Sequence, residues 1–317
     1  MLYSPIQPMH IPDGFLSTLV SIVLWALSAG AVAYALRRVG KDLGERQVPL
    51  MGVLAATIFA GQMLNFTVTG GTSGHLLGAA IATILLGPWA AVIIMTSVVS
   101  IQALVFQDGG LLEMGANIFN MAVIGVAVSY FIYASLRKLL GEKTWAIFVS
   151  GAVAAWSSVV AAALAAALEL AFSGTSPANI AVPAMGGIHA LIGIGEALIT
   201  VGALAFLYSA RRDLLAGGST VPTGGAAVWV FGLGIALFLA LLSPLASSHP
   251  DGLMWVAKQN GFLEAARAPL FNFIPSYVLP GISNKALATI LAGILGALMV
   301  FGVAYGVARL RKNQNAA

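Results

Sequence analysis

Residues 75–106 read HLLGAAIATILLGPWAAVIIMTSVVSIQALVF, an apolar run with Gly87-Pro88 near its middle. A helix needs about 20 apolar residues to cross a bilayer, so the run is too long for one span. Proline removes a backbone hydrogen bond from a helix and clashes with the preceding turn. We therefore predict a tight hairpin or a broken helix at Gly87-Pro88, and we count two spans here, 75–87 and 89–106.

The composition of the whole chain is that of a membrane protein. Of its 317 residues, 59% are hydrophobic and 8% are charged, whereas soluble domains have about 25% charged residues. Further apolar segments occupy 15–36, 49–68, 115–136, 144–172, 184–208, 227–243 and 284–308. The predicted fold class is all-α, a polytopic membrane protein of about nine transmembrane helices in a lipid bilayer.

The basic residues predict the orientation of the chain. With the N-terminus outside, the inside loops receive all of the 15 Lys and Arg residues except Lys258, Arg267 and Lys285. An excess of basic residues marks cytoplasmic loops, which predicts N-out, C-in in the cell inner (cytoplasmic) membrane. The net charge of +4 comes from Lys and Arg residues at helix ends and is interpreted as a feature of the topology. The sequence has no basic stripe with interleaved aromatic residues, so nothing in it indicates nucleic acid as a partner.

Several kinds of chemistry are excluded by missing residues. The chain has no Cys, so a site for a soft metal must use His nitrogen or Met sulfur. No G-x-x-x-x-G-K-[ST] motif occurs, so the chain cannot hydrolyse ATP with a P-loop. An intramembrane enzyme is disfavoured, because HExxH, GxSxG and paired aspartates in the spans are also missing.

A break in composition divides the chain. Charge gives way to Gly, Ser, Thr and Pro at 211–226, which we interpret as a linker. It separates a seven-span unit, 9–210, from a two-span tail, 227–317, whose outer loop covers 244–283. Residues 1–8 lack the basic region of a secretory signal, and we interpret them as a short extension or a mis-assigned start.

The segment Met9-His10-Ile11-Pro12-Asp13-Gly14 stands just before the first span. If the mature chain starts at Met9, its α-amine, the His10 backbone nitrogen and the His10 imidazole can close two small chelate rings on one metal ion. Such planar nitrogen donors suit Ni(II) or Co(II). The alternative is an ordinary interfacial histidine followed by a Pro-Asp-Gly turn. His249-Pro250-Asp251-Gly252 repeats this pattern in part, which we interpret as a second turn that arose by chance.

Ionisable groups inside a bilayer are costly, and each is a candidate for function. His75 closes an outside loop at the mouth of the third span, and His189 is expected about one turn below the outer end of the seventh. Glu196 follows on the same helix face as His189, and Glu169 lies near the outer end of the sixth span. The predicted topology places His10, His75 and His189 on one side. Alternatively, Glu196 is protonated and holds helices together.

Polar residues also surround the loop between the fourth and fifth spans. Gln102 precedes this loop, and Asn117 and Asn120 follow it at a spacing that puts both on one helix face. Their amides can support histidine rings or a buried loop. Satisfying the loop alone would also explain them.

Four motifs in order carry a resemblance to a known family. MHIPDGF, GGTSGHLLG, QALVFQDGG with GANIFNM, and GIHALIGIGEA at 187–197 resemble the substrate-binding membrane components of cobalt and nickel energy-coupling-factor (ECF) transporters, the CbiM/NikM type. The resemblance covers about residues 9–210. The tail is similar to the small N component of these systems, with its PDGLE-like motif, fused into one chain.

The resemblance implies a ligand set and a cargo. The Met9 amine, the backbone nitrogen and ring of His10, and His75 would bind Ni²⁺ or Co²⁺ in a planar arrangement, and imported cobalt would serve cobalamin biosynthesis. The residues that would support this site are His189, Asn120, Gln102, Glu196 and Asn117. The eight residues before Met9 depart from the family pattern and, if retained, would remove the amine ligand.

The resemblance also implies partners, namely a transmembrane coupling (T) subunit and P-loop ATPase subunits. Ala29, Gly30 and Ala33 in the first span permit close helix approach and would dock on the coupling subunit, with internal packing as the alternative. We therefore expect a non-enzymatic subunit of an ATP-driven importer. One alternative is a self-sufficient secondary transporter with Glu196 and His189 as a proton relay, and another is a membrane metal sensor or chaperone.

Overall fold

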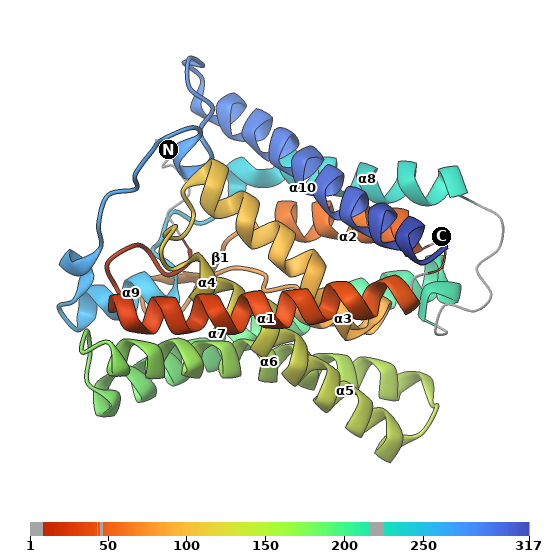
Figure 1. Ribbon diagram of the computed structural model, residues 1–317, viewed down its shortest axis with the longest axis horizontal. Helices are drawn as coiled ribbons and strands as arrows, with labels where there is room; N and C mark the ends of the chain where they lie inside the picture. The colour runs from red at the N-terminus through yellow and green to blue at the C-terminus, as the bar shows by residue number, and fades with distance from the viewer. Residues whose placement is uncertain (1–8, 43, 45–46, 216–224, 317) are drawn as a thin grey trace.

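The computed structural model of the protein describes residues 9–42, 44, 47–215 and 225–316, and it is 76% helical. Most of the helices run along the long axis of the molecule, and their connections gather at its two ends (Figure 1). The longer α-helices are α1 (Thr18–Asp42), α2 (Gln47–Gln62), α3 (Ala79–Ile101), α5 (Gly125–Leu140), α6 (Thr144–Phe172), α7 (Ala178–Ala210), α8 (Gly225–Leu242) and α10 (Lys285–Ala316).

Only some of these helices are long enough to span a membrane. Within the described residues, six helices are long and apolar enough to cross a membrane, and two shorter apolar helices cover Gln47–Gln62 and Val230–Leu245. The segment Ala79–Phe106, where we predicted two spans, forms a single apolar unit by this criterion. Length and composition thus establish a multi-pass helical membrane protein but not the predicted nine spans.

The backbone nevertheless breaks inside α3 at the predicted position. Gly87 has φ 77° and ψ 170°, outside the helical region, directly before Pro88. The two ends of the segment meet at Gln62, whose Nε2 donates to Leu77 O at 2.9 Å and whose Oε1 accepts from Gln102 Nε2 at 2.7 Å. In a continuous helix Leu77 and Gln102 would lie about 37 Å apart. The chain therefore folds back at Gly87-Pro88, as the sequence predicted.

A short β-hairpin replaces the end of the predicted span 49–68. Helix α2 already ends at Gln62, and β1 (Phe66–Val68) pairs antiparallel with β2 (Thr72–Gly74). Gly70 and Gly71 form the tip with φ of 83° and 79°, values that favour glycine. The β-branched run Thr67-Val68-Thr69 directly before Gly70-Gly71 is a hairpin signal that apolar composition alone does not report.

The sixth span was predicted correctly, and the fifth and seventh were displaced at their ends. Helix α6 has the bounds predicted from sequence, 144–172. The short α4 (Met114–Ile118) runs through a π-helical stretch, Phe119–Ile124, into α5. Helix α7 starts at Ala178, ahead of the predicted 184. His189 therefore lies about three turns from the helix start, so its predicted depth of one turn was wrong.

The tail packs on α2 through small residues. A Cβ on Gly232 of α8 would lie 2.1 Å from Val53, and one on Gly296 of α10 would lie 2.2 Å from Phe59. Glycine lets the backbones of neighbouring helices approach closely, and membrane helices commonly associate in this way. Between α8 and α10, the chain forms the short α9 (Gly252–Gln259) and a long loop at the end of the bundle that also holds residues 9–17.

Candidate metal site

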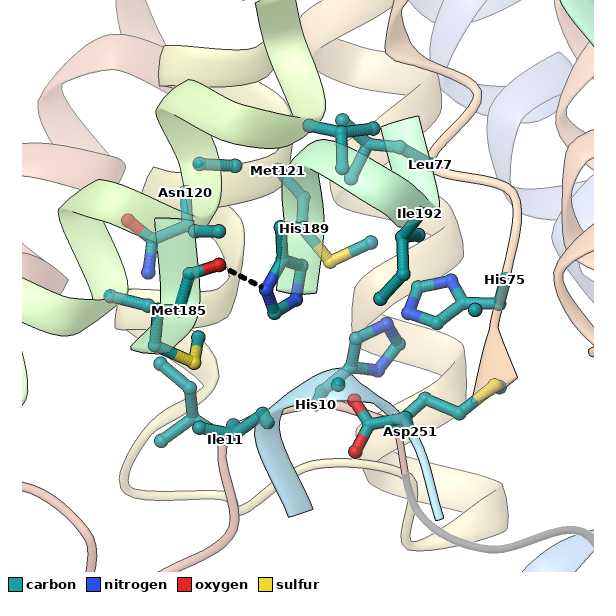
Figure 2. A pocket seen from close by; sticks show the side chains of 18 of the residues that line it. His10, Ile11, His75, Leu77, Asn120, Met121, Met185, His189, Ile192 and Asp251 are labelled. Carbon is teal, nitrogen blue, oxygen red and sulfur yellow. Dashed lines mark hydrogen bonds between the residues drawn. The ribbon is translucent and has the colours of Figure 1, made fainter. Parts of the chain in front are cut away.

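A cavity of about 90 Å³ lies where the N-terminal segment, the hairpin loop, the helices and the tail meet. Figure 2 shows the side chains around it. The lining residues include Met9, His10 and Ile11 before α1, His75 before α3, Asn117, Asn120 and Met121 after the glycine loop, Met185 and His189 on α7, and Asp251 to Leu253 of the tail. The structure therefore brings together His10, His75 and His189, as expected from sequence.

The N-terminal segment is held in place by hydrogen bonds to the backbone of Ile11. Ile11 N donates to Asn117 Oδ1 at 3.0 Å, and Asn117 Nδ2 donates to Ile11 O at 3.1 Å. Gly110 N also donates to Ile11 O at 2.8 Å. Of the two predicted uses of Asn117, the support of a buried loop is the one observed.

Asp108 connects the first described residues with the tail. Its Oδ1 accepts from Met9 N at 2.6 Å, and its Oδ2 accepts from the Tyr277 hydroxyl at 2.6 Å. His10 Nδ1 donates to the Asp108 carbonyl at 3.1 Å, which leaves the buried His10 Nε2 without a hydrogen-bond partner. Sequence reasoning missed Asp108 and Tyr277. The only local signal was an acidic residue beside Gly109-Gly110.

His75 lies beside His10 in the cavity lining. The ring centroids are 5.5 Å apart at an interplanar angle of 88°. His75 Nδ1 donates to Leu76 O at 2.9 Å, so the lone pair is on Nε2. Burial, and secondarily the proximity of His10, lowers the pKa of His75 to about 4. The imidazole is therefore neutral at physiological pH, as a metal ligand must be.

His189 lies across the cavity from the His10 and His75 pair (Figure 2). Its Nδ1 donates to Met185 O at 2.8 Å, which again directs a lone pair on Nε2 away from the helix backbone. Tail residue Gly252 approaches this ring so closely that a Cβ would lie 2.9 Å from Nε2. The remaining histidine, His249, is exposed and lies outside the cavity lining.

The other predicted support residues hold loops and helices. Glu196 accepts from Leu77 N at 2.7 Å and from Gly78 N at 2.9 Å, which fixes the segment after His75. Asn120 lines the cavity and donates to Glu169 Oε2 at 2.8 Å. Gln102 donates to Gln62, a residue that sequence analysis did not select.

The tail forms one wall of the cavity. Ser73 N donates to Pro250 O at 2.8 Å, and Ser73 Oγ donates to His249 O at 2.8 Å. Asp251 then turns inward and begins α9, where its Oδ1 accepts from Met254 N at 2.8 Å. Burial raises the pKa of Asp251 to about 8. Asp251 and Gly252 of this segment thus line the same cavity as His10.

The small residues of α1 point away from the protein. Ala29, Gly30 and Ala33 are exposed, and a Cβ on Gly30 would meet nothing within 4 Å. Ala35 on the opposite face is fully buried. Internal packing therefore does not explain the three exposed residues. Docking on a partner stays a prediction, as does a mature start at Met9, because residues 1–8 lie outside the described part of the chain.

Two family models match successive parts of the chain. Residues 10–214 match the family model "Cobalt uptake substrate-specific transmembrane region", and residues 226–313 match "PDGLE domain". A putative fused nickel transport protein NikMN from Archaeoglobus fulgidus is 34% identical, over 95% of this chain and 98% of the relative. The fused nickel transport protein NikMN of Rhodobacter capsulatus is 32% identical, over 93% and 96%.

A solved structure shares the fold of the first unit. The crystal structure of a truncated transition metal transporter is 37% identical to this chain, with a TM-score of 0.57. The match covers 63% of this chain and 99% of that one.

Proposed function

Because the chain belongs to the family of cobalt-uptake substrate-specific transmembrane regions, we propose that it is the metal-specific subunit of an ATP-driven importer of Ni²⁺ or Co²⁺. The observation that carries the proposal is the cavity shared by His10, His75 and His189. Neutral imidazole nitrogens suit these ions, whereas carboxylate cages suit Mg²⁺ or Ca²⁺. The fused relatives are named as nickel transport proteins, which favours Ni²⁺.

The chain would hold the ion through its own N-terminus. In a chain that starts at Met9, the α-amine, the His10 backbone nitrogen and His10 Nδ1 would form the chelate, and His75 Nε2 would supply the fourth nitrogen. His10 Nδ1 would exchange its Asp108 carbonyl partner for the metal. An amide bond from Pro8 to Met9 would remove the amine donor, so the proposal requires removal of residues 1–8 or translation from Met9.

The membrane arrangement would be nine spans, N-out and C-in, in the inner membrane. The fold-back at Gly87 supports two passes within 79–106, and α2 and α8 would supply the shorter ones. The first unit, 9–210, would bind the metal, and 227–317 would form the fused N component. Single cysteines test this: His249→Cys should react with an impermeant reagent in intact cells, and Leu140→Cys should not. The reverse pattern would exclude this orientation.

Energy would come from partner chains. The sequence has no P-loop, and Ala29, Gly30 and Ala33 offer an exposed small-residue face on α1 for a coupling subunit. Both Glu196 oxygens accept backbone N–H groups, an arrangement that favours a structural role over a proton relay. Ala33→Trp should reduce copurification of the coupling subunit and leave metal binding intact. Uptake in membranes without any ATPase partner would refute this scheme.

The N-terminal chelate has a direct test. Protein extracted from membranes is measured by intact mass and titrated with Ni²⁺ and with Co²⁺. We expect a chain that begins at Met9, a planar yellow Ni²⁺ complex, and release of protons when the metal binds. A chain that retains residues 1–8 and still forms this complex would refute the amine ligand.

A further inference from the structure

One tail side chain, Tyr277, reaches the carboxylate that contacts the proposed metal ligands. The Tyr277 hydroxyl donates to Asp108 Oδ2 at 2.6 Å. The second oxygen of the same group, Oδ1, accepts from Met9 N at 2.6 Å and lies 3.4 Å from His10 Nδ1. Asp108 is only 1% exposed. A single buried carboxylate thus joins the tail to the metal-binding end of the first unit.

The tail holds this phenol rigidly. Tyr277 is 1% exposed, and its ring stacks on Phe106 with centroids 4.8 Å apart and planes 14° apart. Ile274 N donates to Val105 O at 3.0 Å and anchors the segment before it. Ser276 and Tyr277 have φ of 51° and 58°, a left-handed conformation that is rare outside glycine. Such strain persists only where the surroundings fix it, and it clusters at functional sites.

We propose that Tyr277 is a positioning residue for metal capture and acts through Asp108. With Oδ2 occupied by the phenol, Oδ1 is directed at Met9 N and the His10 ring, so two adjacent donors are oriented before the metal arrives. Hydrogen-bond partners behind metal ligands typically change metal affinity about 10–100-fold when removed. The tail is then a part of the binding site and not only an attached module. This inference rests on the proposed function.

The test is a double-mutant cycle on Ni²⁺ affinity, measured with the full chain. Tyr277→Phe removes the hydroxyl and keeps the stacking on Phe106, and Asp108→Asn removes the carboxylate charge. Each should weaken binding about 10-fold or more. Because Tyr277 acts through Asp108, the double variant should bind no more weakly than Asp108→Asn alone. Tyr277→Phe should also shift the visible absorption band of the bound Ni²⁺.

A matched control separates this role from general attachment of the tail. Trp255 Nε1 donates to Gly70 O at 2.9 Å, so it also joins the tail to the first unit, yet it lies outside the cavity lining. Trp255→Phe should leave the Ni²⁺ affinity within about twofold of the wild-type value. This is well below the loss that follows removal of a hydrogen-bond partner of a metal ligand. Equal losses in Trp255→Phe and Tyr277→Phe would overturn the inference.

The remaining outcomes separate this inference from the proposed function. If the wild-type chain binds Ni²⁺ and Tyr277→Phe binds it with the same affinity, the role of Tyr277 is overturned but the proposed function stands. The same holds if the losses of the two single variants are fully additive in the double variant. A wild-type chain that begins at Met9 and binds neither Ni²⁺ nor Co²⁺ would overturn the proposed function and the inference together.

Discussion

The chain contains two similar turns, His10-Ile11-Pro12-Asp13-Gly14 and His249-Pro250-Asp251-Gly252, and the fold uses them in opposite ways. In the first, the histidine is inside: His10 is 4% exposed and lines the cavity, while Asp13 Oδ1 accepts from Leu112 N at 2.8 Å. In the second, the histidine is exposed and the aspartate lines the cavity.

The two histidines face different ways because different residues hydrogen-bond to the backbone of each turn. Asn117 and Gly110 bond both sides of Ile11, which holds His10 against His75. Ser73 instead bonds the carbonyls of residues 249 and 250, and the short parallel bridge from Ser73 to Asp251 turns residue 251 inward. Two similar sequences thus acquire different roles because their partners, far away in the chain, differ.

The largest expected contrast is between the two histidines. His10→Ala should weaken Ni²⁺ binding by more than about 100-fold, because it removes a ring nitrogen that would bind the metal. Removing a hydrogen-bond partner of a ligand costs less, about 10–100-fold. His249→Ala, the matched control, should leave affinity unchanged, since that side chain is exposed. Isothermal titration of both variants checks this. Comparable losses would mean that the two turns share the ligand role.

The glycines of the tail give the next contrast. A Cβ on Gly252 would lie 2.8 Å from His189 Cε1 and 2.7 Å from Ile192 Cδ1. Gly252→Ala should therefore destabilise the protein by about 1–3 kcal/mol and weaken metal binding. Gly234→Ala in α8, where a Cβ would meet nothing within 4 Å, is the control. Thermal unfolding in detergent measures both, and equal melting temperatures would show that the second turn tolerates displacement.

The last contrast is a pH dependence shared by both turns. Burial raises the pKa of Asp251 to about 8, and burial together with Asp13 raises that of Glu113, which accepts from Gly14 N, to about 8. Between the unfolded values, 3.8 and 4.5, and about 8, the folded state binds more protons than the unfolded state. Stability from these groups is therefore complete at low pH and is lost as pH rises through about 8.

Neutral variants isolate this effect. Asp251→Asn and Glu113→Gln imitate the protonated groups, so each should flatten the fall in melting temperature between pH 5 and about 8. Asn also remains a good cap for α9. A wild-type chain whose melting temperature rises over this interval would contradict the raised pKa values.

Local chemistry made several features predictable. Gly87-Pro88 breaks α3, because proline lacks the N–H and glycine adopts φ of 77° without strain. Continuous apolar composition likewise predicted α6 to the residue. His10, His75 and His189 could be selected because polar groups in so apolar a chain need a reason, and the structure places all of them around one cavity.

What the sequence by itself determined is thus a helical membrane protein, its fold-back at Gly87-Pro88 and the histidines of its candidate site. The tertiary structure alone placed Asp251 in the cavity lining and brought Asp108 and Tyr277 into hydrogen-bond contact beside Met9. The contact between Asp108 and Tyr277 spans 169 positions along the chain, and the one between Ser73 and Pro250 spans 177. No local pattern encodes such pairs, because they arise only when the tail packs on α2 and lays its loop over the N-terminal segment.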